Sequence, residues 1–456
     1  MRYSHKEQIN TARRKISQTG PPLTIIMDLE QHLQKLECHF TWELGSSKNE
    51  LLILLSNLND VSQERCTWLI HYYNLLGYIQ QALGSNTEAL MYLCKAESVM
   101  QEQGTEEAGV RLQVNKANLA WVYFLMGKMD ESKKYLEEVK MLQQMHPAPP
   151  GCALHPEVSG EKGWTLVKFN KSKKRQAIDY LKMALKAEPA RKEWHKGLAM
   201  AMSKTYTIYN CPPQLKAEIV KQLKTAHEQE PNSLFFHALY LEKRSEVHRE
   251  DNERQMQDLL EKAIETGDLE CLGTIFRYFR TISVDKAIDE AERARKKFPT
   301  SNRVLKYLAI CKKWKVFNMK EDNMERRTLA RESTELFEEV VKHYPDSLRE
   351  KIALASMHDY AGNSERADEI YQQFLLQMDD FPPHSKQYIY YSYACHLYMC
   401  RRLEESINHH MKVAEIPDNT IDKQKSIKIL KKTGMNGRNP RCEEIWNFLE
   451  RIHIDD

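Results

Sequence analysis

The stretch YNLLGYIQQALGSNTEALMYLCKA, residues 73–96, contains two helix-like segments that meet at Gly84. The first segment carries a small residue at Gly77, and the second carries Ala89 and Ala96. Small residues at such positions let two helices approach closely. The pattern is typical of a tetratricopeptide unit, which is a helix pair of about 34 residues with small residues at the helix crossing. We therefore predict a helical repeat protein.

A similar order of small residues and turns recurs in four further units. These units contain Leu119, Ala120, Gly127 and Leu136; Ala177, Leu181, Ala184 and Pro189; Tyr278, Ala287, Ala291 and Pro299; and Leu354, Ala355, Gly362 and Ala367. One helix pair cannot bury both of its apolar stripes, so such units stack into a solenoid. Extra residues between units are found at 145–160, 204–213, 244–257 and 313–328. The expected fold is all-α: a tetratricopeptide-repeat superhelical solenoid, interrupted by insertions, with a basic concave groove or tunnel.

The repeat pattern also predicts how the chain is divided. The expected parts are a disordered leader at 1–30, an N-terminal repeat subdomain at 31–145, central repeats forming a pocket at 146–300, C-terminal repeats at 301–435, and a terminal helix at 436–456.

Composition limits the classes of function. The chain has 456 residues and a net charge of only +3, so a nucleic-acid site would have to be a local concentration of Lys and Arg. It contains no run of eighteen apolar residues, which argues against a transmembrane helix. Its ten cysteines include no Cys-x-x-Cys pair, which is typical of a reduced, cytoplasmic protein.

Motifs for catalysis are absent from the sequence. It has no phosphate-binding Gly-x-x-x-x-Gly-Lys-Ser/Thr, no Gly-x-Ser-x-Gly and no His-Glu-x-x-His. His396 stands in an apolar segment and is expected to be a core histidine, and the adjacent His409 and His410 point to different helix faces. We therefore predict no catalytic residue, no metal site and no cofactor.

Basic residues are clustered and interleaved with aromatic ones. A run of them between Lys168 and Arg175 follows Trp164, and Lys312, Lys313 and Lys315 surround Trp314. Lysine neutralises phosphates and aromatic faces stack on unpaired bases, so this mixture suits single-stranded RNA. A cluster of this kind taken alone is usually a solvated helix face, and only a joint location inside the solenoid would indicate RNA binding.

Several motifs together resemble one family. The chain has LECHFTWEL at 36–44, NLLGY at 74–78, NLAWVY at 118–123, EKGWTLVK at 161–168, SVDKA at 283–287, PTS at 299–301 and AGN at 361–363. In this order they resemble the interferon-induced proteins with tetratricopeptide repeats, over residues 33–435. The resemblance implies a cytoplasmic, interferon-induced antiviral protein of innate immunity. Such a protein holds the 5′ end of single-stranded RNA, with a triphosphate or a cap, in a basic tunnel.

The resemblance also implies roles for individual residues and for partners. Trp164 matches the tryptophan that stacks on the cap, and Lys168 matches a lysine that contacts phosphate. Lys204 stands for an arginine, Phe235 for a tyrosine and Lys306 for a histidine. The implied partners are single-stranded or capped RNA, other members of the same family, and translation or signalling proteins, with no membrane.

Three positions depart from the family pattern. Where the family has an arginine and a glutamine that hold the 5′ phosphates, this chain has Ser56 and Asp60, and Leu272 replaces another tunnel arginine. Arg65 or Arg277 could compensate. We therefore expect a protein that sequesters viral RNA and blocks its translation. The alternative is a protein-interaction scaffold in innate immune signalling that kept the fold without RNA 5′-end recognition.

Overall fold

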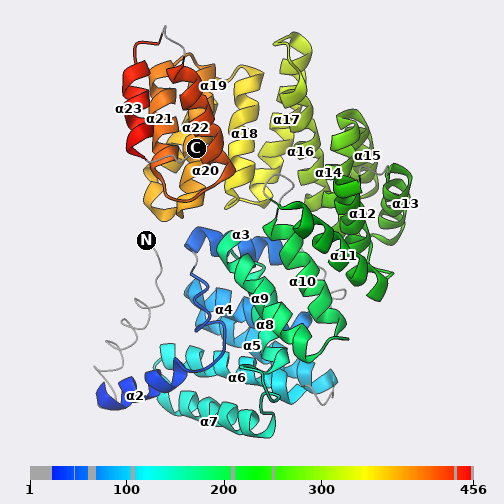
Figure 1. Cartoon of the computed structure of the whole chain (residues 1–456), viewed down its shortest axis with the longest axis vertical. Coiled ribbons are helices and arrows are strands. Elements are labelled where there is room, and N and C mark those ends of the chain that lie inside the picture. Colours follow the sequence, from blue (N-terminus) through cyan, green and yellow to red (C-terminus); the bar gives the residue numbers. More distant parts are fainter. Residues whose placement is uncertain are drawn as a thin grey trace. The chain divides into compact units, whose positions relative to one another are not determined.

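The computed structural model describes residues 23–45, 47–59, 68–103, 108–206, 211–248, 252–435 and 439–452. These residues form helices joined by short connections, and no strand is found among them (Figure 1). The all-α prediction is confirmed. Most of the expected leader at 1–30 lies outside the described residues, and residues 23–30 belong to a helix. The expected terminal helix at 436–456 is described only in part, where 442–451 are helical.

The chain divides into two compact units, one ending at Ile275 and the other beginning at Phe276. The N-terminal unit contains α2 (Leu23–Leu33), α3 (Lys48–Asn59), α4 (Leu69–Ala82), α5 (Asn86–Gln103), α6 (Ala108–Leu125), α7 (Met129–Met145), α8 (Pro156–Leu166), α9 (Lys171–Ala187), α10 (Lys192–Thr205), α11 (Pro213–Gln229), α12 (Leu234–His248), α13 (Glu253–Thr266) and the short η2 (Leu269–Cys271). Helix α14 (Leu272–Ile282) contains the point of division.

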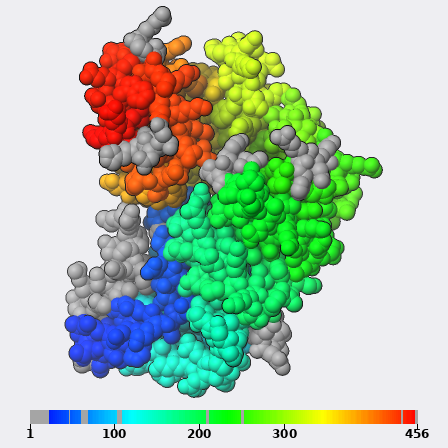
Figure 2. Space-filling view, viewed as in Figure 1, coloured from blue at the N-terminus to red at the C-terminus, as the bar shows by residue number. Residues whose placement is uncertain are grey.

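The C-terminal unit continues with further helices. They are α15 (Val284–Lys297), α16 (Asn302–Asn318), α17 (Met324–His343), α18 (Leu348–Ala361), α19 (Ser364–Leu376), η3 (Met378–Asp380), α20 (Pro383–Met399), α21 (Leu403–Glu415), α22 (Ile421–Gly434) and α23 (Cys442–Arg451). In the space-filling view, described residues of the N-terminal unit are coloured from blue to green and those of the C-terminal unit from light green to red (Figure 2).

Small residues occur where the helices of a pair cross, as the sequence predicts. A methyl group added at Gly77 on α4 would come within 2.7 Å of Leu93 on α5. Ala89 and Ala96 are completely buried. The turns between the helices of a pair contain glycines in the left-handed region, with φ of 98° at Gly84 and 81° at Gly127. Only glycine adopts this conformation without a steric cost, so these positions fix the sharp reversal between helices.

One predicted insertion is taken up by helix. Residues 313–328 were expected as extra chain between repeats. They comprise the end of α16, a connection at 319–323 and the start of α17, and the two helices are 17 and 20 residues long. Separate apolar cores join α16 to α18, α18 to α20, and α21 to α23. Among the described helices, none is both long enough and apolar enough to cross a membrane.

Candidate nucleic-acid interface

Helix α8 carries the predicted aromatic site residue and is built for close packing. It begins with Pro156 in its first turn, after His155, whose ring accepts a hydrogen bond from the backbone N–H of Glu157. Pro is favoured there because its missing N–H needs no partner. At Gly160 a methyl group would come within 2.0 Å of the Trp194 ring, so glycine is what allows α10 to place its indole against α8.

Trp164 belongs to an aromatic cluster. Its ring centroid lies 5.9 Å from that of Trp68, and Trp68 lies 5.9 Å from Trp194. The Lys168 ammonium lies 4.4 Å from the centre of the Trp164 ring. Only 3% of Trp164 is exposed to solvent. A base can therefore stack on this ring only if Lys168 moves away from it.

The segment 36–44, which carries the first family motif, holds α8 in place. The backbone N–H of His39 donates to Asn118 on α6 at 3.2 Å, and the Asn118 amide donates back to Nδ1 of His39 at 3.1 Å. Burial lowers the pKa of His39 to about 4, so the ring is neutral and its Nε2–H is left to donate to Thr165 at 3.2 Å. The motif therefore links α6 to α8 through one buried histidine.

The same segment provides a carboxylate beside the basic residues. Glu37 accepts hydrogen bonds from the Trp42 indole at 2.7 Å and from Lys162 of α8 at 2.9 Å. Lys162 also lies 4.5 Å from the centre of the Tyr180 ring on α9. This carboxylate therefore balances the charge of Lys162 on α8.

A buried ion triad lies at the start of α8. Glu157 pairs with Arg111 of α6 at 3.1 Å and with Arg191, next to α10, at 2.6 Å. Burial raises the pKa of Glu157, and the two arginines oppose that shift. Removing one partner of such a buried pair leaves an uncompensated charge. The triad therefore fixes α6, α8 and the start of α10 relative to one another.

A second buried carboxylate lies one turn further along α8. Glu161 approaches the His71 ring of α4 at 3.3 Å and accepts a hydrogen bond from Asn74 at 2.9 Å. Burial alone raises the pKa of Glu161, but the charge and hydrogen bond of His71 outweigh it and lower the pKa. Helices α4 and α8 are thus joined beneath the tryptophan cluster by groups that solvent does not reach.

Three lysines on neighbouring helices are close enough for their charges to act on Lys204, and one of them, Lys168, lies against the Trp164 ring. Lys168 follows α8, Lys174 lies in α9, and Lys204 lies in the last turn of α10. The Lys204 side chain is exposed. Even so, desolvation by the surrounding protein, together with the charges of Lys168 and Lys174, lowers its pKa to about 7, while Glu270 opposes the shift. An ammonium that is desolvated and repelled by other cations would be stabilised by a bound anion.

The start of α9 adds to this positive charge. Asn170 caps the helix by accepting from the backbone N–H of Lys173 at 3.1 Å. The first turn contains no acidic residue and instead carries Lys171, Lys173 and Lys174. Cations at a helix N-terminus oppose the helix dipole, which favours anions there. The local arrangement is therefore one that an anion would stabilise.

The remaining predicted site residues are found on other helices. Phe235, near the start of α12, is half-buried, and its ring centroid lies 5.3 Å from that of Phe236. Arg277 on α14 is exposed, and Lys306 on α16 is half-buried with its ammonium 4.3 Å from the centre of the Tyr344 ring. Arg277 and Lys306 belong to the C-terminal unit, whereas Trp164, Lys168, Lys204 and Phe235 belong to the N-terminal unit.

Two of the departures from the family pattern can be located. Ser56 is half-buried on α3, and Leu272 is fully buried at the start of α14. Asp60 and Arg65 lie outside the described residues.

The sequence did not single out every residue of this cluster. Trp68 and Trp194 were not connected with Trp164, although all three are large residues on or beside α4, α8 and α10. Lys174 was noted only as part of a basic run. The signal that could have identified it is the run itself, because Lys168 and Lys174 lie on either side of the turn into α9.

Comparisons with known proteins agree with the repeat architecture. A family model described as a tetratricopeptide repeat matches residues 70–99 and 116–144. These ranges correspond to α4 with α5 and to α6 with α7, which are the first two of the predicted units.

Similar proteins cover nearly the whole chain. The human antiviral innate immune response effector IFIT1 is 27% identical over 421 residues, which are 89% of this chain and 87% of that protein. The human interferon-induced protein with tetratricopeptide repeats 2 is also 27% identical, over 93% of this chain and 92% of its own length.

Solved structures show the same fold. A human IFIT1 dimer with the capped RNA m7Gppp-AAAA superposes with a TM-score of 0.68 at 24% identity, covering 93% of this chain and 98% of that chain. The IFIT1 dimer with PPP-AAAA gives a TM-score of 0.67 at 23% identity, with the same coverage.

Proposed function

This chain is a divergent member of the family of interferon-induced proteins with tetratricopeptide repeats, and we propose that it is a cytoplasmic antiviral RNA-binding protein. In this proposal it sequesters viral single-stranded RNA and thereby blocks translation of that RNA. Its partners are single-stranded or capped RNA and other members of the same family, as in the IFIT1 dimers that hold RNA.

The observation that carries the proposal is the lysine cluster beside Trp164. Lys168, Lys174 and Lys204 come from three successive helical elements. Desolvation, together with the charges of Lys168 and Lys174, lowers the pKa of Lys204. Positive side chains held close together and partly out of water repel one another, which costs free energy. A bound polyanion neutralises them and offsets that cost. The Trp164 ring lies under the Lys168 ammonium. It offers a stacking surface for a base when the Lys168 side chain moves off the ring to contact a phosphate.

Binding of an unstructured RNA oligonucleotide, measured at several salt concentrations, tests the proposal. For single strands, the logarithm of the binding constant falls with the logarithm of salt concentration with a slope of about −0.7 per neutralised phosphate. Three lysines at phosphates give a slope near −2, or about a 20-fold loss of affinity between 50 and 200 mM salt. Absence of binding at low salt would instead support the interaction scaffold.

We expect that a triphosphate at the 5′ end of the RNA does not increase the affinity of this chain for the RNA. The positions that hold 5′ phosphates in the family are Ser56 and Asp60 in this chain. At an effective dielectric constant near 20, a carboxylate at ~4 Å from a phosphate costs roughly 4 kcal/mol before screening. The expected result is that 5′-triphosphate RNA binds no better than the same RNA with a 5′-hydroxyl. Trp164 makes capped RNA the stronger candidate, through a cation–π contact with the methylated guanine.

The measurement is a competition titration at fixed salt with triphosphate, capped and hydroxyl ends. Asp60→Gln serves as the matched variant, and it is expected to bind triphosphate RNA more tightly than the unmodified chain does. A tenfold preference of the unmodified chain for triphosphate would contradict the prediction and direct attention to Arg65 or Arg277.

A further inference from the structure

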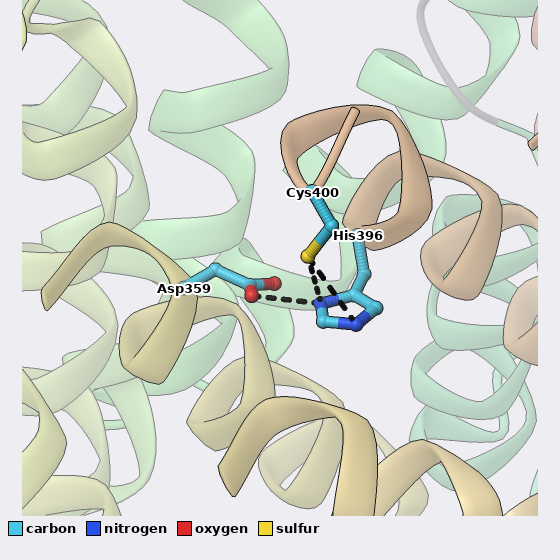
Figure 3. A group of neighbouring side chains, drawn as sticks. All are labelled: Asp359, His396 and Cys400. Carbon is cyan, nitrogen blue, oxygen red and sulfur yellow. Dashed lines mark hydrogen bonds and ion pairs between the residues drawn. The ribbon is translucent and has the colours of Figure 1, made fainter. Parts of the chain in front are cut away.

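Helices α18 and α20 of the C-terminal unit bring three potential metal ligands together. Asp359 lies near the end of α18, His396 lies in the last turn of α20, and Cys400 directly follows α20. One donor atom from each lies within 4.8 Å of the other two. Figure 3 shows the carboxylate and the thiol approaching the imidazole from different sides.

The positions of these groups follow from how α20 ends. His396 and Cys400 are four residues apart, so they lie on the same side of the helix. The N–H of Cys400 still donates to the carbonyl of His396 at 3.0 Å. The next residue, Arg401, has a φ of 63°, a left-handed conformation that stops the helix. The thiol is therefore held beside the imidazole, one turn away.

The contacts among the three groups are close to those of a metal centre. Nδ1 of His396 lies 2.7 Å from Oδ1 of Asp359, and Sγ of Cys400 lies 3.9 Å from Nδ1 and 3.7 Å from Nε2. A tetrahedral Zn²⁺ with ordinary bond lengths places neighbouring N, O and S donors about 3.3–3.6 Å apart. Sγ is nearly equidistant from the two ring nitrogens, so it lies against the face of the imidazole. To take up a metal ion, the ring must turn until Nδ1 points between the thiol and the carboxylate, and Asp359 must move back from the ring.

The surroundings of the imidazole complete the arrangement. Nε2 of His396 lies 3.3 Å from Oδ1 of Asp368, on α19. That carboxylate oxygen also accepts from Tyr393 at 3.1 Å and from Arg402 at 3.3 Å. A metal-binding histidine usually donates its second ring N–H to a carboxylate, which orients the ring and makes it a better ligand. Asp368 is in that position when Nδ1 is the ligand atom.

We propose that Asp359, His396 and Cys400 form a binding site for one divalent transition-metal ion, with Zn²⁺ the ion that fits this donor set best. A thiolate, an imidazole and a carboxylate are all ligands that zinc takes, and a thiolate disfavours Mg²⁺ and Ca²⁺. Binding replaces two protons, one from the Cys400 thiol and one shared by Asp359 and Nδ1. The ionised thiolate and carboxylate then balance the charge of the ion, and water fills the fourth position.

Solvent access and charge at the site are compatible with loading. Asp359 is 8% exposed and His396 is 2% exposed, while Cys400 is half-buried and provides the way in. Because the thiol must lose its proton to bind the ion, metal affinity should rise with pH.

No sequence motif indicates this site, because the only neighbour of His396 at ligand spacing is a single cysteine, Cys400. Asp359 comes from a helix 37 residues earlier.

The test uses the full chain, which is first stripped of metal with a chelator and then given Zn²⁺ or Co²⁺. With Zn²⁺ we expect one zinc per chain by native mass spectrometry. With Co²⁺ we expect a thiolate-to-cobalt charge-transfer absorption in the near ultraviolet. Cys400→Ser should abolish this absorption. Asp368→Asn should keep it but weaken metal affinity about 10- to 100-fold. Cys395→Ser is the matched control, since Cys395 is also half-buried on α20 but lies outside the cluster, and it should leave both unchanged.

Thermal unfolding separates loss of the site from loss of the fold. Zinc should raise the Tm of the unmodified chain and of Cys395→Ser but not that of Cys400→Ser, because a ligand that binds only the folded state stabilises it. Should Cys400→Ser fail to fold, the weakened affinity of Asp368→Asn carries the test. The proposal is overturned if cobalt gives no thiolate absorption, or if folded Cys400→Ser retains it. Neither result depends on RNA binding.

Discussion

Replacing Lys168 and Lys204 together by glutamate is expected to weaken binding of single-stranded RNA by more than about 100-fold, or ~2.7 kcal/mol, with little change in Tm. Each replacement removes a cation and adds an anion where phosphates are expected to lie, and a like-charge contact at close range costs several kcal/mol before screening. The fold should tolerate the change. Loss of the contact between Lys168 and the Trp164 ring costs about 0.5–1 kcal/mol, and relief of repulsion among the lysines offsets it.

The measurement is a binding titration of both proteins with the same RNA at low salt, accompanied by thermal unfolding. A suitable control is the double variant Lys186→Glu with Lys221→Glu, which changes the net charge equally at exposed positions of α9 and α11. If the control loses RNA binding to the same extent, the net charge of the whole protein, and not this cluster, accounts for the binding. Persistence of binding in the first variant would exclude the cluster as the site.

RNA affinity is also expected to fall as pH rises above neutrality. In the free protein the pKa of Lys204 is about 7, below its ordinary value, because of desolvation and the neighbouring lysines. A phosphate favours the charged form and therefore raises this pKa in the complex. Below about pH 7 the lysine is already charged, so binding is at full strength. Above it, binding must take up a proton, and affinity falls by up to about tenfold per pH unit until the pKa of the complex is reached.

Between pH 6 and pH 8.5 this linkage predicts a loss of about 30-fold. It should be measured with RNA carrying a 5′-hydroxyl, so that no terminal phosphate titrates in this range. Lys204→Arg is the matched variant, because a guanidinium stays charged throughout. Its profile should be nearly flat, and at pH 8.5 it should bind RNA more tightly than the unmodified chain does. A flat profile for the unmodified chain would contradict the prediction, because Lys204 then either does not contact the RNA or has an ordinary pKa.

The repeat fold could be predicted because its determinants are local. Gly77, Ala89 and Ala96 show where two helices cross, and Gly84 shows where the chain reverses between them. Both requirements are steric and act within one helix pair, so they repeat along the chain at a spacing that can be counted. The insertion expected at 313–328 is the contrasting case. Most of its residues extend two helices. This could not be predicted, because the spacing of a repeat does not show whether extra residues form a loop or more helix.

The motif at 36–44 could be recognised from the sequence, but its physical role could not. His39 donates to and accepts from groups on α6 and α8 that lie 79 and 126 residues away. Neither its neutral state nor its partners follow from neighbouring residues. The same holds for Trp68 and Trp194, which surround Trp164 only because Gly160 lets α10 approach α8.

The sequence by itself determined that this protein is a helical repeat with lysines and aromatic residues in its central units. Only the tertiary structure decided which of them act together. Lys168 and Lys204 are separated in the chain by α9 and most of α10, and the charge of Lys168 acts on Lys204 because these helices pack side by side. Asp359 meets His396 and Cys400 for the same reason. Electrostatic energy and metal coordination depend on distances through space and on the exclusion of water, and both arise only after the helices have packed.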